Sequence, residues 1–334
     1  MKALVIENGF GLDNVRVADV PDPTPQPGEV LVRVRAASLN YRDLLIVKGA
    51  YNPKLNFPRV LGSDCAGEVA ALGAGVSRWA VGNRVAPCFF TNWDDGPIPA
   101  DTGKNTYGSE CDGVFAEFVC VREGALVRVP NHLTYEEAAT LPCAAVTAWN
   151  ALVTAGVGPG SSVLLQGSGG VSLFGLQFAK ALGASVFITS GSDEKLSRAL
   201  ALGADAGTNY RTNPDWDKWT RQQSGGAGAD VVLEVGGAGT LERSVRAVRT
   251  GGHVALIGVL AGGTAFNPIQ VLMKAVRVQG VFVGSRAHFE ALNAVLTRDT
   301  LRPVIDRTFP LAEGAAALRH MESGAHFGKL VLTV

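Results

Sequence analysis

The sequence contains few cysteines and no Cys-x-x-Cys pair. Its five cysteines are scattered along 334 residues. This spacing argues against a disulfide framework and against a structural zinc ribbon, and it indicates a reducing compartment. We therefore expect a cytoplasmic protein. The five are Cys65, Cys88, Cys111, Cys120 and Cys143.

The sequence also lacks excess charge and long apolar runs. Thirty basic and thirty acidic residues cancel, so nothing predicts a nucleic-acid surface or a polyanionic partner. No apolar run reaches membrane-spanning length, and the first residues lack a signal-peptide pattern. The length predicts two domains with a core each. We expect a small-molecule substrate, with no nucleic-acid or membrane partner.

What the chain does have is a glycine-rich turn inside the segment 162–190. An apolar run at 163–165 precedes the turn, apolar residues at helical spacing follow over 171–182, and a second apolar run covers 184–188. Strand, turn, helix and strand of this length form a βαβ unit that binds a dinucleotide, and an ordinary glycine-rich turn is the alternative. The third glycine of the fingerprint falls at Ser172, so the match is imperfect.

The turn places a pyrophosphate at the N-terminus of the helix. Gly167 suits a tight turn, and Gly169 leaves room for the backbone to approach the phosphates among unpaired N–H groups. The predicted cofactor contacts of this turn are Gly167, Ser168, Gly169, Gly170 and Val171.

The character of the chain changes after residue 130. The first 125 residues show β character, with predicted strands at 2–7, 15–20, 29–36, 67–71, 84–87 and 115–119. Beyond 130, strands alternate with helices, which predicts a doubly wound parallel sheet. The excursion 88–113 carries Phe89, Phe90, Trp93 and Tyr107, and it predicts a lid or pocket wall, or else a mobile surface insertion.

Six segments together resemble a known family: ASLNYRDL (37–44), LGSDCAGEV (61–69), LPCAAVTAW (141–149), QGSGGVSLFGLQFAKALGA (166–184), GADVVLEVGG (228–237) and GGHVALIG (251–258). The chain resembles the medium-chain dehydrogenases/reductases, in the zinc-free branch that includes quinone oxidoreductases. The resemblance implies an α/β fold. It assigns 1–125 and 270–334 to a GroES-like, β-rich catalytic domain and 126–269 to a Rossmann nucleotide-binding domain, with the active site between them.

The departures from the zinc-dependent members of this family concern the metal ligands. A cysteine would stand at Asn40 and a His-Glu pair at Ser63-Asp64, so only Cys143 remains as a possible ligand. One thiol cannot hold a catalytic zinc, which needs three protein ligands. We expect no metal, and Cys143 is then a small buried hydrophobe.

Without zinc, the expected reaction is hydride transfer to a conjugated carbonyl, that is, a quinone or an α,β-unsaturated ketone or aldehyde. The resemblance places Asn40 against the nicotinamide or the substrate carbonyl, although the residue also suits a helix N-cap. Tyr51 is a proton donor, an orienting group or only a surface ring. One alternative is alcohol oxidation, with Ser63, Asp64 or Tyr51 taking the proton. Another is a non-catalytic NADPH-binding protein with a structural or regulatory role.

The residues near position 190 predict NADP(H) in preference to NAD(H). NAD-specific folds carry a carboxylate where the second strand ends, whereas this strand ends in Ile-Thr-Ser. Hydroxyls and cations from the surrounding loops suit a 2′-phosphate, although Lys195 can equally face solvent and Arg211 can equally cap a loop. The predicted contacts of the phosphate are Ser190, Ser192, Lys195, Tyr210 and Arg211.

Further cofactor contacts and the oligomeric state follow from the same resemblance. The apolar segment 276–283 is expected to be a strand at a sheet edge, where family members often pair, so we expect a homodimer. The additional predicted cofactor contacts are Thr147, Val235, Gly236, Ile257, Gly258, Val259, Phe282, Val283 and Gly284.

Overall fold

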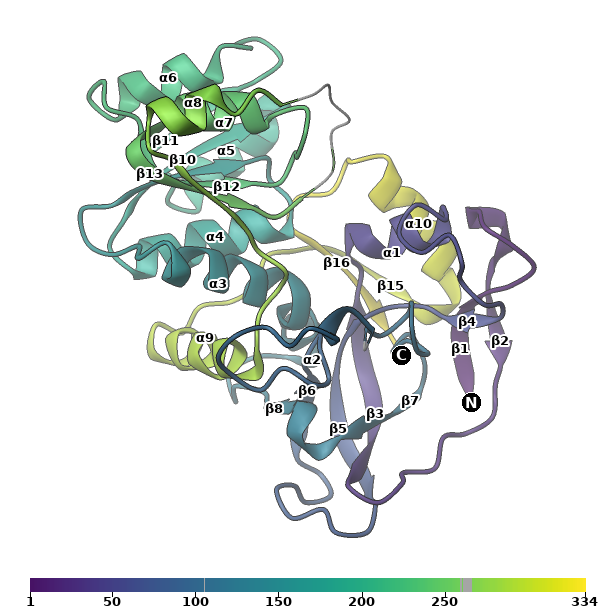
Figure 1. Ribbon diagram of the computed structural model, residues 1–334. Coiled ribbons are helices and arrows are strands. Elements are labelled where there is room, and N and C mark those ends of the chain that lie inside the picture. Colours follow the sequence, from purple (N-terminus) through teal and green to yellow (C-terminus); the bar gives the residue numbers. More distant parts are fainter. Residues whose placement is uncertain (105, 259, 261–265) are drawn as a thin grey trace. The chain divides into compact units, whose positions relative to one another are not determined.

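The computed structural model describes residues 1–104, 106–258, 260 and 266–334. The chain forms two compact units, one from 1–146 with 284–334 and one from 147–283 (Figure 1). Both chain ends thus build one unit and the middle of the chain builds the other, and the predicted α/β fold class is confirmed. The predicted cofactor contact Val259 lies outside the described residues.

The first unit is organised around the long strand β3 (Glu29–Ser38). This strand pairs antiparallel with β5 (Asp64–Leu72), β7 (Phe118–Arg122) and the C-terminal β16 (Lys329–Thr333). The sheet continues through β15 on one side and through β6 and β8 on the other, and β1, β2 and β4 form a separate small sheet. These further strands are β15 (Ile305–Pro310), β6 (Arg84–Pro87), β8 (Leu126–Arg128), β1 (Lys2–Ile6), β2 (Val15–Asp19) and β4 (Arg59–Val60).

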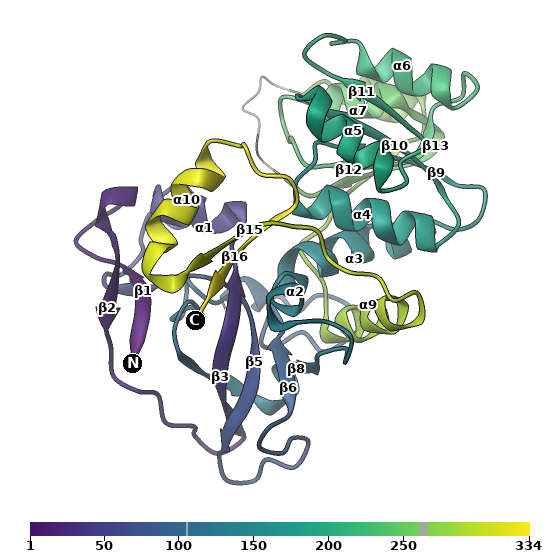
Figure 2. The ribbon, with the colours of Figure 1, turned by 180° about the vertical axis from the view of Figure 1, so that it is seen from behind.

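Short helices cover this sheet. Helix α10 packs on β15 and β16 and lies beside α1 (Figure 2). A π-helix at Leu141–Ala145 follows α2 and contacts β5. The α-helices are α1 (Tyr41–Val47), α2 (Tyr135–Ala139), α9 (Arg286–Arg298) and α10 (Gly314–Glu322). The 3-10 helices are Leu12–Asn14, Thr102–Lys104, Glu123–Ala125 and Leu311–Glu313.

The second unit is a six-stranded parallel sheet in the order β11-β10-β9-β12-β13-β14. Helices α3 and α4 lie on one face, and α7 and α8 lie on the other (Figure 1). The strands are β9 (Ser162–Gln166), β10 (Ser185–Ser190), β11 (Ala206–Asn209), β12 (Ala229–Glu234), β13 (Val248–Leu256) and β14 (Arg277–Gly280). The helices are α3 (Val146–Thr154), α4 (Gly170–Ala181), α5 (Asp193–Ala201), α6 (Trp216–Gln223), α7 (Leu241–Ala247) and α8 (Ile269–Met273).

The strand order reverses between β9 and β12, which are adjacent in the sheet but separated by two strands in the chain. Nucleotides bind at the carboxyl ends of the strands at such a switch point. The glycine-rich turn follows β9 directly, so the sheet order agrees with the position predicted for the cofactor.

The boundaries between the two units differ from the predicted domain boundaries. Residues 126–146 belong to the first unit, because β8 pairs with β6 and α2 packs against β3 and β5. Residues 270–283 belong to the second unit, because β14 pairs with β13.

One predicted strand lies later in the chain than expected, and another is shorter. Residues 115–117 precede β7 because the backbone of Phe115 bonds instead to Leu4 and Leu61, at N···O distances of 2.7 and 3.0 Å. Strand β14 ends at Gly280, and Val283 has φ 53, a left-handed conformation that a β-branched residue cannot hold within a strand.

The aromatic residues of the excursion 88–113, which is predicted to be a lid or pocket wall or else a mobile surface insertion, lie in the core. Phe89, Phe90, Trp93 and Tyr107 are all buried, at most 7% exposed. The Phe90 ring packs on Phe89 at 4.8 Å between centroids and on Trp93 at 6.0 Å. Within the described part of the chain, no helix combines the length and the apolar character that a membrane crossing needs.

Gly258 allows the ends of β12 and β13 to approach each other. A Cβ atom at this position would lie 1.9 Å from the Val235 carbonyl oxygen. The Gly258 N–H also donates to the Glu234 carbonyl at 3.1 Å.

We therefore expect Gly258→Ala to lower the free energy of unfolding by about 1–3 kcal/mol, because the backbone must shift to accept the methyl group. Gly280→Ala on the neighbouring β14 is the control, since its added Cβ meets no atom within 4 Å. Urea unfolding of the two variants measures the difference. Equal free energies of unfolding would show that the close approach is not a constraint.

Candidate active site

A buried polar cluster forms where β3 pairs with β5 and β16. The register places Ser38 opposite Asp64 of β5 and opposite Val331 of β16. Residues near positions 40, 64 and 329 therefore come together at one end of the sheet. Predicted site residues Asn40 and Ser63 lie in this cluster, together with Asp64 and Lys329.

The Asn40 side chain is held by Lys329. The Lys329 ammonium donates to Asn40 Oδ1 at 2.6 Å and to the Leu39 carbonyl at 2.5 Å. Asn40 Nδ2 donates to Ser63 Oγ at 3.4 Å, and the Asn40 backbone N–H donates to Asp43 Oδ2 at 2.8 Å. Asn40 therefore caps α1, as considered above, and its side chain also contacts the buried Lys329 ammonium.

Asp64 accepts a hydrogen bond on each carboxylate oxygen. Ser63 Oγ donates to Oδ1 at 2.7 Å, and the Cys143 backbone N–H donates to Oδ2 at 2.9 Å. Burial raises the pKa of Asp64, and the positive charge of Lys329 opposes this shift. Burial lowers the pKa of Lys329, and Asp64 is the main group acting against that change. The two charges therefore support each other's ionised state.

Burial also affects the neighbouring titratable groups. It raises the pKa of Asp43 from 3.8 to about 6, although Arg42 acts in the opposite direction. It raises the pKa of the Cys143 thiol well above its usual value, and Asp64 adds to this effect. At neutral pH the thiol is consequently protonated.

These donors do not fit a zinc ion. Zinc is bound by thiolate, neutral imidazole or carboxylate, and the ligands must be deprotonated. Here the Cys143 thiol is neutral, the Asp64 oxygens are engaged, and the Lys329 ammonium would repel a dication. Among the described residues no group of three or more His, Cys, Asp and Glu side chains is arranged to hold a metal ion.

Tyr51 lies after α1 on a buried arginine. Its ring is 37% exposed and packs on the Arg42 guanidinium at 4.6 Å. Arg42 in turn donates to the Tyr107 carbonyl at 2.8 Å and to Thr106 Oγ1 at 2.9 Å, so the excursion 88–113 holds the arginine in place. In the described structure no hydrogen bond joins the Tyr51 side chain to Asn40 or Ser63.

The glycine-rich turn of the second unit has the geometry of a phosphate-binding loop. Gly167 has φ 70, and Gly169 directly precedes α4. A Cβ at either position would meet no atom within 4 Å, so the loop is open. Unpaired N–H groups at the start of a helix suit a pyrophosphate, and this loop therefore fits a dinucleotide.

The helix packing expected of the third glycine is found at Gly175. A Cβ there would lie 3.0 Å from the side chains of Leu165 on β9 and Leu233 on β12. Ser172 instead donates its hydroxyl to the Gln166 carbonyl at 2.6 Å. The close contact between helix and sheet is thus made by Gly175, three residues after the position where the fingerprint has its third glycine.

The loop after β12 is held by the buried carboxylate of Glu234, which the sequence analysis did not identify. Glu234 accepts from the backbone N–H groups of Gly236 and Gly237 at 2.7 and 2.8 Å, and from Gln166 Nε2 at 2.8 Å. Gln166 Oε1 accepts from the N–H of Val235 at 3.2 Å and of Gly236 at 3.3 Å. The N–H groups of the predicted contacts Val235 and Gly236 are therefore already paired.

The end of β10 brings together most residues predicted to bind a 2′-phosphate. A Cβ at Gly191 would lie 2.5 Å from the Tyr210 hydroxyl and 3.1 Å from Arg211 Nε, so both side chains lie over this glycine. Ser192 accepts from the Lys195 N–H at 3.4 Å and caps α5. Ser190 is 2% exposed, and its hydroxyl accepts from the Ser192 N–H at 3.3 Å, so it shapes the turn.

The remaining predicted contacts lie near the first and last residues of the second unit or directly after β13. Thr147 is buried at the start of α3, and Ile257 and Gly258 follow β13. Phe282 is 43% exposed, and the Val283 carbonyl accepts from Asn150 Nδ2 at 2.8 Å. Gly284 begins the second segment of the first unit, where a Cβ would lie 2.8 Å from the Val146 side chain.

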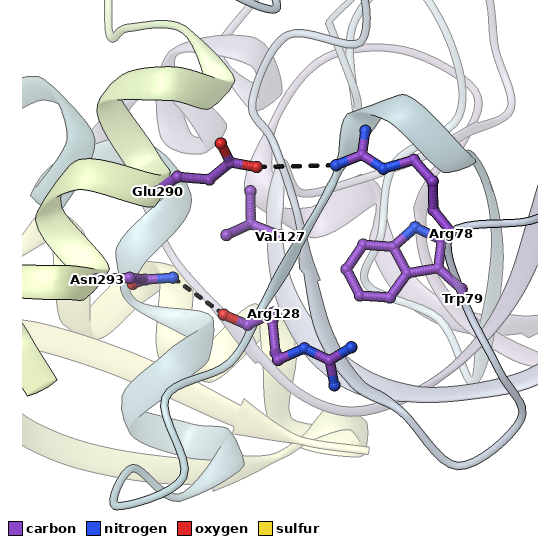
Figure 3. Close-up of a pocket in the computed structure, with 6 residues that line it drawn as sticks. All are labelled: Arg78, Trp79, Val127, Arg128, Glu290 and Asn293. Atoms are coloured by element: carbon purple, nitrogen blue, oxygen red, sulfur yellow. Dashed lines mark hydrogen bonds and ion pairs between the residues drawn. The ribbon is translucent and has the colours of Figure 1, made fainter.

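A separate pocket of about 350 Å³ lies in the first unit between β8 and α9 (Figure 3). Arg78 pairs with Glu290 across it at 3.8 Å, and Asn293 Nδ2 donates to the Arg128 carbonyl at 3.0 Å. Trp79 and Val127 complete the lining, which contains none of the predicted site residues.

Two family profiles match the chain. The alcohol dehydrogenase GroES-like domain matches residues 26–131, and the zinc-binding dehydrogenase family matches residues 170–298. A zinc-type alcohol dehydrogenase-like protein of Schizosaccharomyces pombe is 41% identical over 100% of the chain and 99% of its own length. Acryloyl-coenzyme A reductase of Metallosphaera sedula is 30% identical over the full length of both.

Solved structures with the same fold are similar over nearly the whole chain. An NAD-dependent alcohol dehydrogenase is 36% identical with a TM-score of 0.91, covering 100% of both chains. The 2-octenoyl-CoA carboxylase reductase CinF, in complex with NADP and 2-octenoyl-CoA, is 28% identical with a TM-score of 0.88, covering 99% of this chain and 87% of that one. The two neighbours are thus described with different nicotinamide cofactors.

Proposed function

Because the chain belongs to the medium-chain dehydrogenase/reductase superfamily, whose members are NAD(P)-dependent oxidoreductases, we propose that it uses NADPH to reduce a conjugated carbonyl compound without a metal ion. The substrate class is a quinone or an α,β-unsaturated ketone or aldehyde. When bound, the nicotinamide cofactor supplies the hydride, and Gly167 to Gly170 hold its pyrophosphate.

The observation that supports this proposal is the state of the Asn40 side chain. Its oxygen is engaged by the Lys329 ammonium, so the amide offers N–H groups. A conjugated carbonyl receives hydride at a carbon remote from its oxygen, where negative charge then develops. A fixed N–H donor stabilises such charge without a Lewis acid. Two similar proteins are described with conjugated carbonyl compounds. One is named for acryloyl-CoA, and the other was solved in complex with 2-octenoyl-CoA.

Alcohol oxidation is the second candidate, and the Ser63–Asp64 pair favours it. Ser63 Oγ donates to Asp64 Oδ1 at 2.7 Å. A substrate hydroxyl could pass its proton to Ser63 Oγ while the original Ser63 proton moves to Asp64, whose pKa burial has raised. When bound, the oxidised cofactor would accept the hydride from the alcohol carbon.

One assay separates the candidates. The purified chain is incubated with NADPH and a panel of quinones, enones and saturated aldehydes, and with NADP⁺ and primary and secondary alcohols, before and after dialysis against a chelator. We expect turnover of the conjugated compounds that dialysis leaves unchanged. Turnover only of alcohols and saturated aldehydes supports the second candidate, activity lost with zinc overturns metal independence, and cofactor binding without turnover indicates a non-catalytic protein.

Tyr51 is proposed as the proton donor for the product enolate. We expect Tyr51→Phe to lower kcat by about 10²–10⁴-fold while the Kd for NADPH changes little, because the hydroxyl acts on charge that forms during the reaction. Tyr41→Phe is the matched control, since Tyr41 begins α1 and is 39% exposed, close to the 37% of Tyr51. An unchanged kcat would leave Tyr51 as a ring that only packs on Arg42.

Cofactor preference is proposed to depend on Arg211. Its guanidinium lies over Gly191 and forms no ion pair within the described part of the chain, while Asp193 accepts from Asn209 Nδ2 at 2.7 Å and is occupied. A charge-assisted bond contributes about 1.5–3 kcal/mol, so we expect NADPH to bind at least about tenfold tighter than NADH. Arg211→Ala should remove most of this ratio.

Titration of both cofactors by fluorescence gives the dissociation constants. Lys218→Ala on α6 is the control for loss of a charge in the same unit. Equal Kd values for NADPH and NADH in the unchanged protein would contradict the preference.

A homodimer is proposed through the open edge of β14. This strand ends the sheet, and helix α8 beside it exposes Ile269, Leu272 and Met273 at 46, 73 and 72%. An unpaired strand edge with adjacent apolar side chains favours pairing with a second copy. We expect Leu272→Lys with Met273→Lys to convert a dimer to a monomer in light scattering after gel filtration, whereas Leu200→Lys on α5 should not. A monomer before substitution would overturn the proposal.

A further inference from the structure

We propose that Lys329 is a positioning residue that fixes which end of the Asn40 amide is offered to the substrate. The inference rests on the proposed role of Asn40. Lys329 lies in the last strand of the chain, is 4% exposed, and has no place in the hydride transfer itself.

The chemistry of the two groups sets the orientation. The two ends of an asparagine amide are nearly equal in size but opposite in hydrogen bonding, since one accepts and the other donates. A lysine ammonium only donates. At 2.6 Å from the Lys329 nitrogen, the neighbouring amide atom must therefore be the oxygen, which leaves the N–H groups for Ser63 and for a substrate oxygen.

The rest of the cluster enforces the same direction. Lys329 donates to Asn40, Asn40 Nδ2 donates to Ser63 Oγ, and Ser63 donates to Asp64. The far end is anchored by the Cys143 N–H, which donates to the second oxygen of Asp64. Turning the amide over would place its NH₂ group against the ammonium and its oxygen against a hydroxyl whose hydrogen is committed to Asp64.

A competing explanation is that Lys329 only neutralises Asp64. Both side chains are buried, and an uncompensated buried charge is strongly destabilising. The two explanations differ in what they require of Lys329: positioning requires a hydrogen-bond donor at Asn40, whereas neutralisation requires only a positive charge.

Two variants of similar size separate donor from charge. Lys329→Gln keeps an N–H donor that reaches toward Asn40, whereas Lys329→Met keeps neither donor nor charge. Both variants leave Asp64 without its cation, so we expect them to lose a similar amount of stability. We expect Lys329→Met to lower kcat for enone reduction by about tenfold or more with the Kd for NADPH within about twofold, since the Asn40 donor is no longer held at the oxyanion. Lys329→Gln should recover most of this loss, and equal kcat values for the two variants would overturn the proposal.

A further pair of variants covers the case in which the single variants do not fold. Lys329→Met with Asp64→Asn removes both charges, and Asp64→Asn alone is its reference. Positioning predicts that the double variant folds but keeps the loss of kcat relative to this reference. Recovery of kcat to the reference level would assign Lys329 to neutralisation alone and overturn the proposal.

A measurement without turnover separates this inference from the proposed function. In protein labelled with ¹⁵N at asparagine, the Asn40 side-chain NH₂ signal is identified by its loss in Asn40→Leu. The signal should shift in Lys329→Met more than in Lys329→Gln. An unchanged protein that reduces no conjugated carbonyl would overturn the proposed function, whereas an Asn40 signal that is the same in all forms would overturn the positioning role.

Discussion

The antiparallel pairing of β3 with both β5 and β16 is the constraint on which the polar cluster depends. It brings Asp64 and Lys329, from opposite ends of the chain, to the same end of one sheet. A slip of the register by one residue would turn the side chains of a strand to the other face. The apolar residues of β3 that alternate into the core, such as Val30, Val32 and Val34, prevent such a slip because they would lose their burial.

In the polar cluster, charged and uncharged side chains fix one another's orientation. A carboxylate and an ammonium, each costly to bury alone, stabilise each other with uncharged groups between them. The amide and the hydroxyl that separate the charges are thereby oriented by fixed partners. Under the proposed function, the site would act through these directed hydrogen bonds instead of through a metal ion.

The sequence was sufficient for the fold class and for the βαβ unit. The glycine turn after an apolar run and the six family segments carried that information. Contacts between residues that are distant in the chain could not be predicted from the sequence. Lys329 reads as the first residue of an apolar strand, and only the pairing with β3 shows that its ammonium meets Asn40. A lysine as the first residue of an apolar strand was the one sequence feature that indicated a buried ammonium.

Local composition was also insufficient to locate apolar residues in the packed structure. The aromatic residues of the excursion 88–113 predicted a lid or pocket wall, or else a mobile surface insertion. They did not reveal that Phe89 and Phe90 lie in the core and that the Tyr107 carbonyl accepts from Arg42. The apolar run 276–283 suggested one long strand, but the left-handed backbone at Val283 interrupts it. In both segments the apolar residues indicated that part of the segment is buried. Their order in the sequence did not show which residues are buried or where the strand ends.

The order of the elements along the chain has a consequence for synthesis on the ribosome. The second unit is contiguous from 147 to 283, so its sheet is complete in sequence before β15 and β16 are made. During translation, domains generally fold as units as they emerge. The first unit must therefore wait with Ala36–Ser38, at the end of β3, unpaired on the side that β16 later covers. The nascent chain thus holds the complete sequence of the second unit before Asn40 meets Lys329.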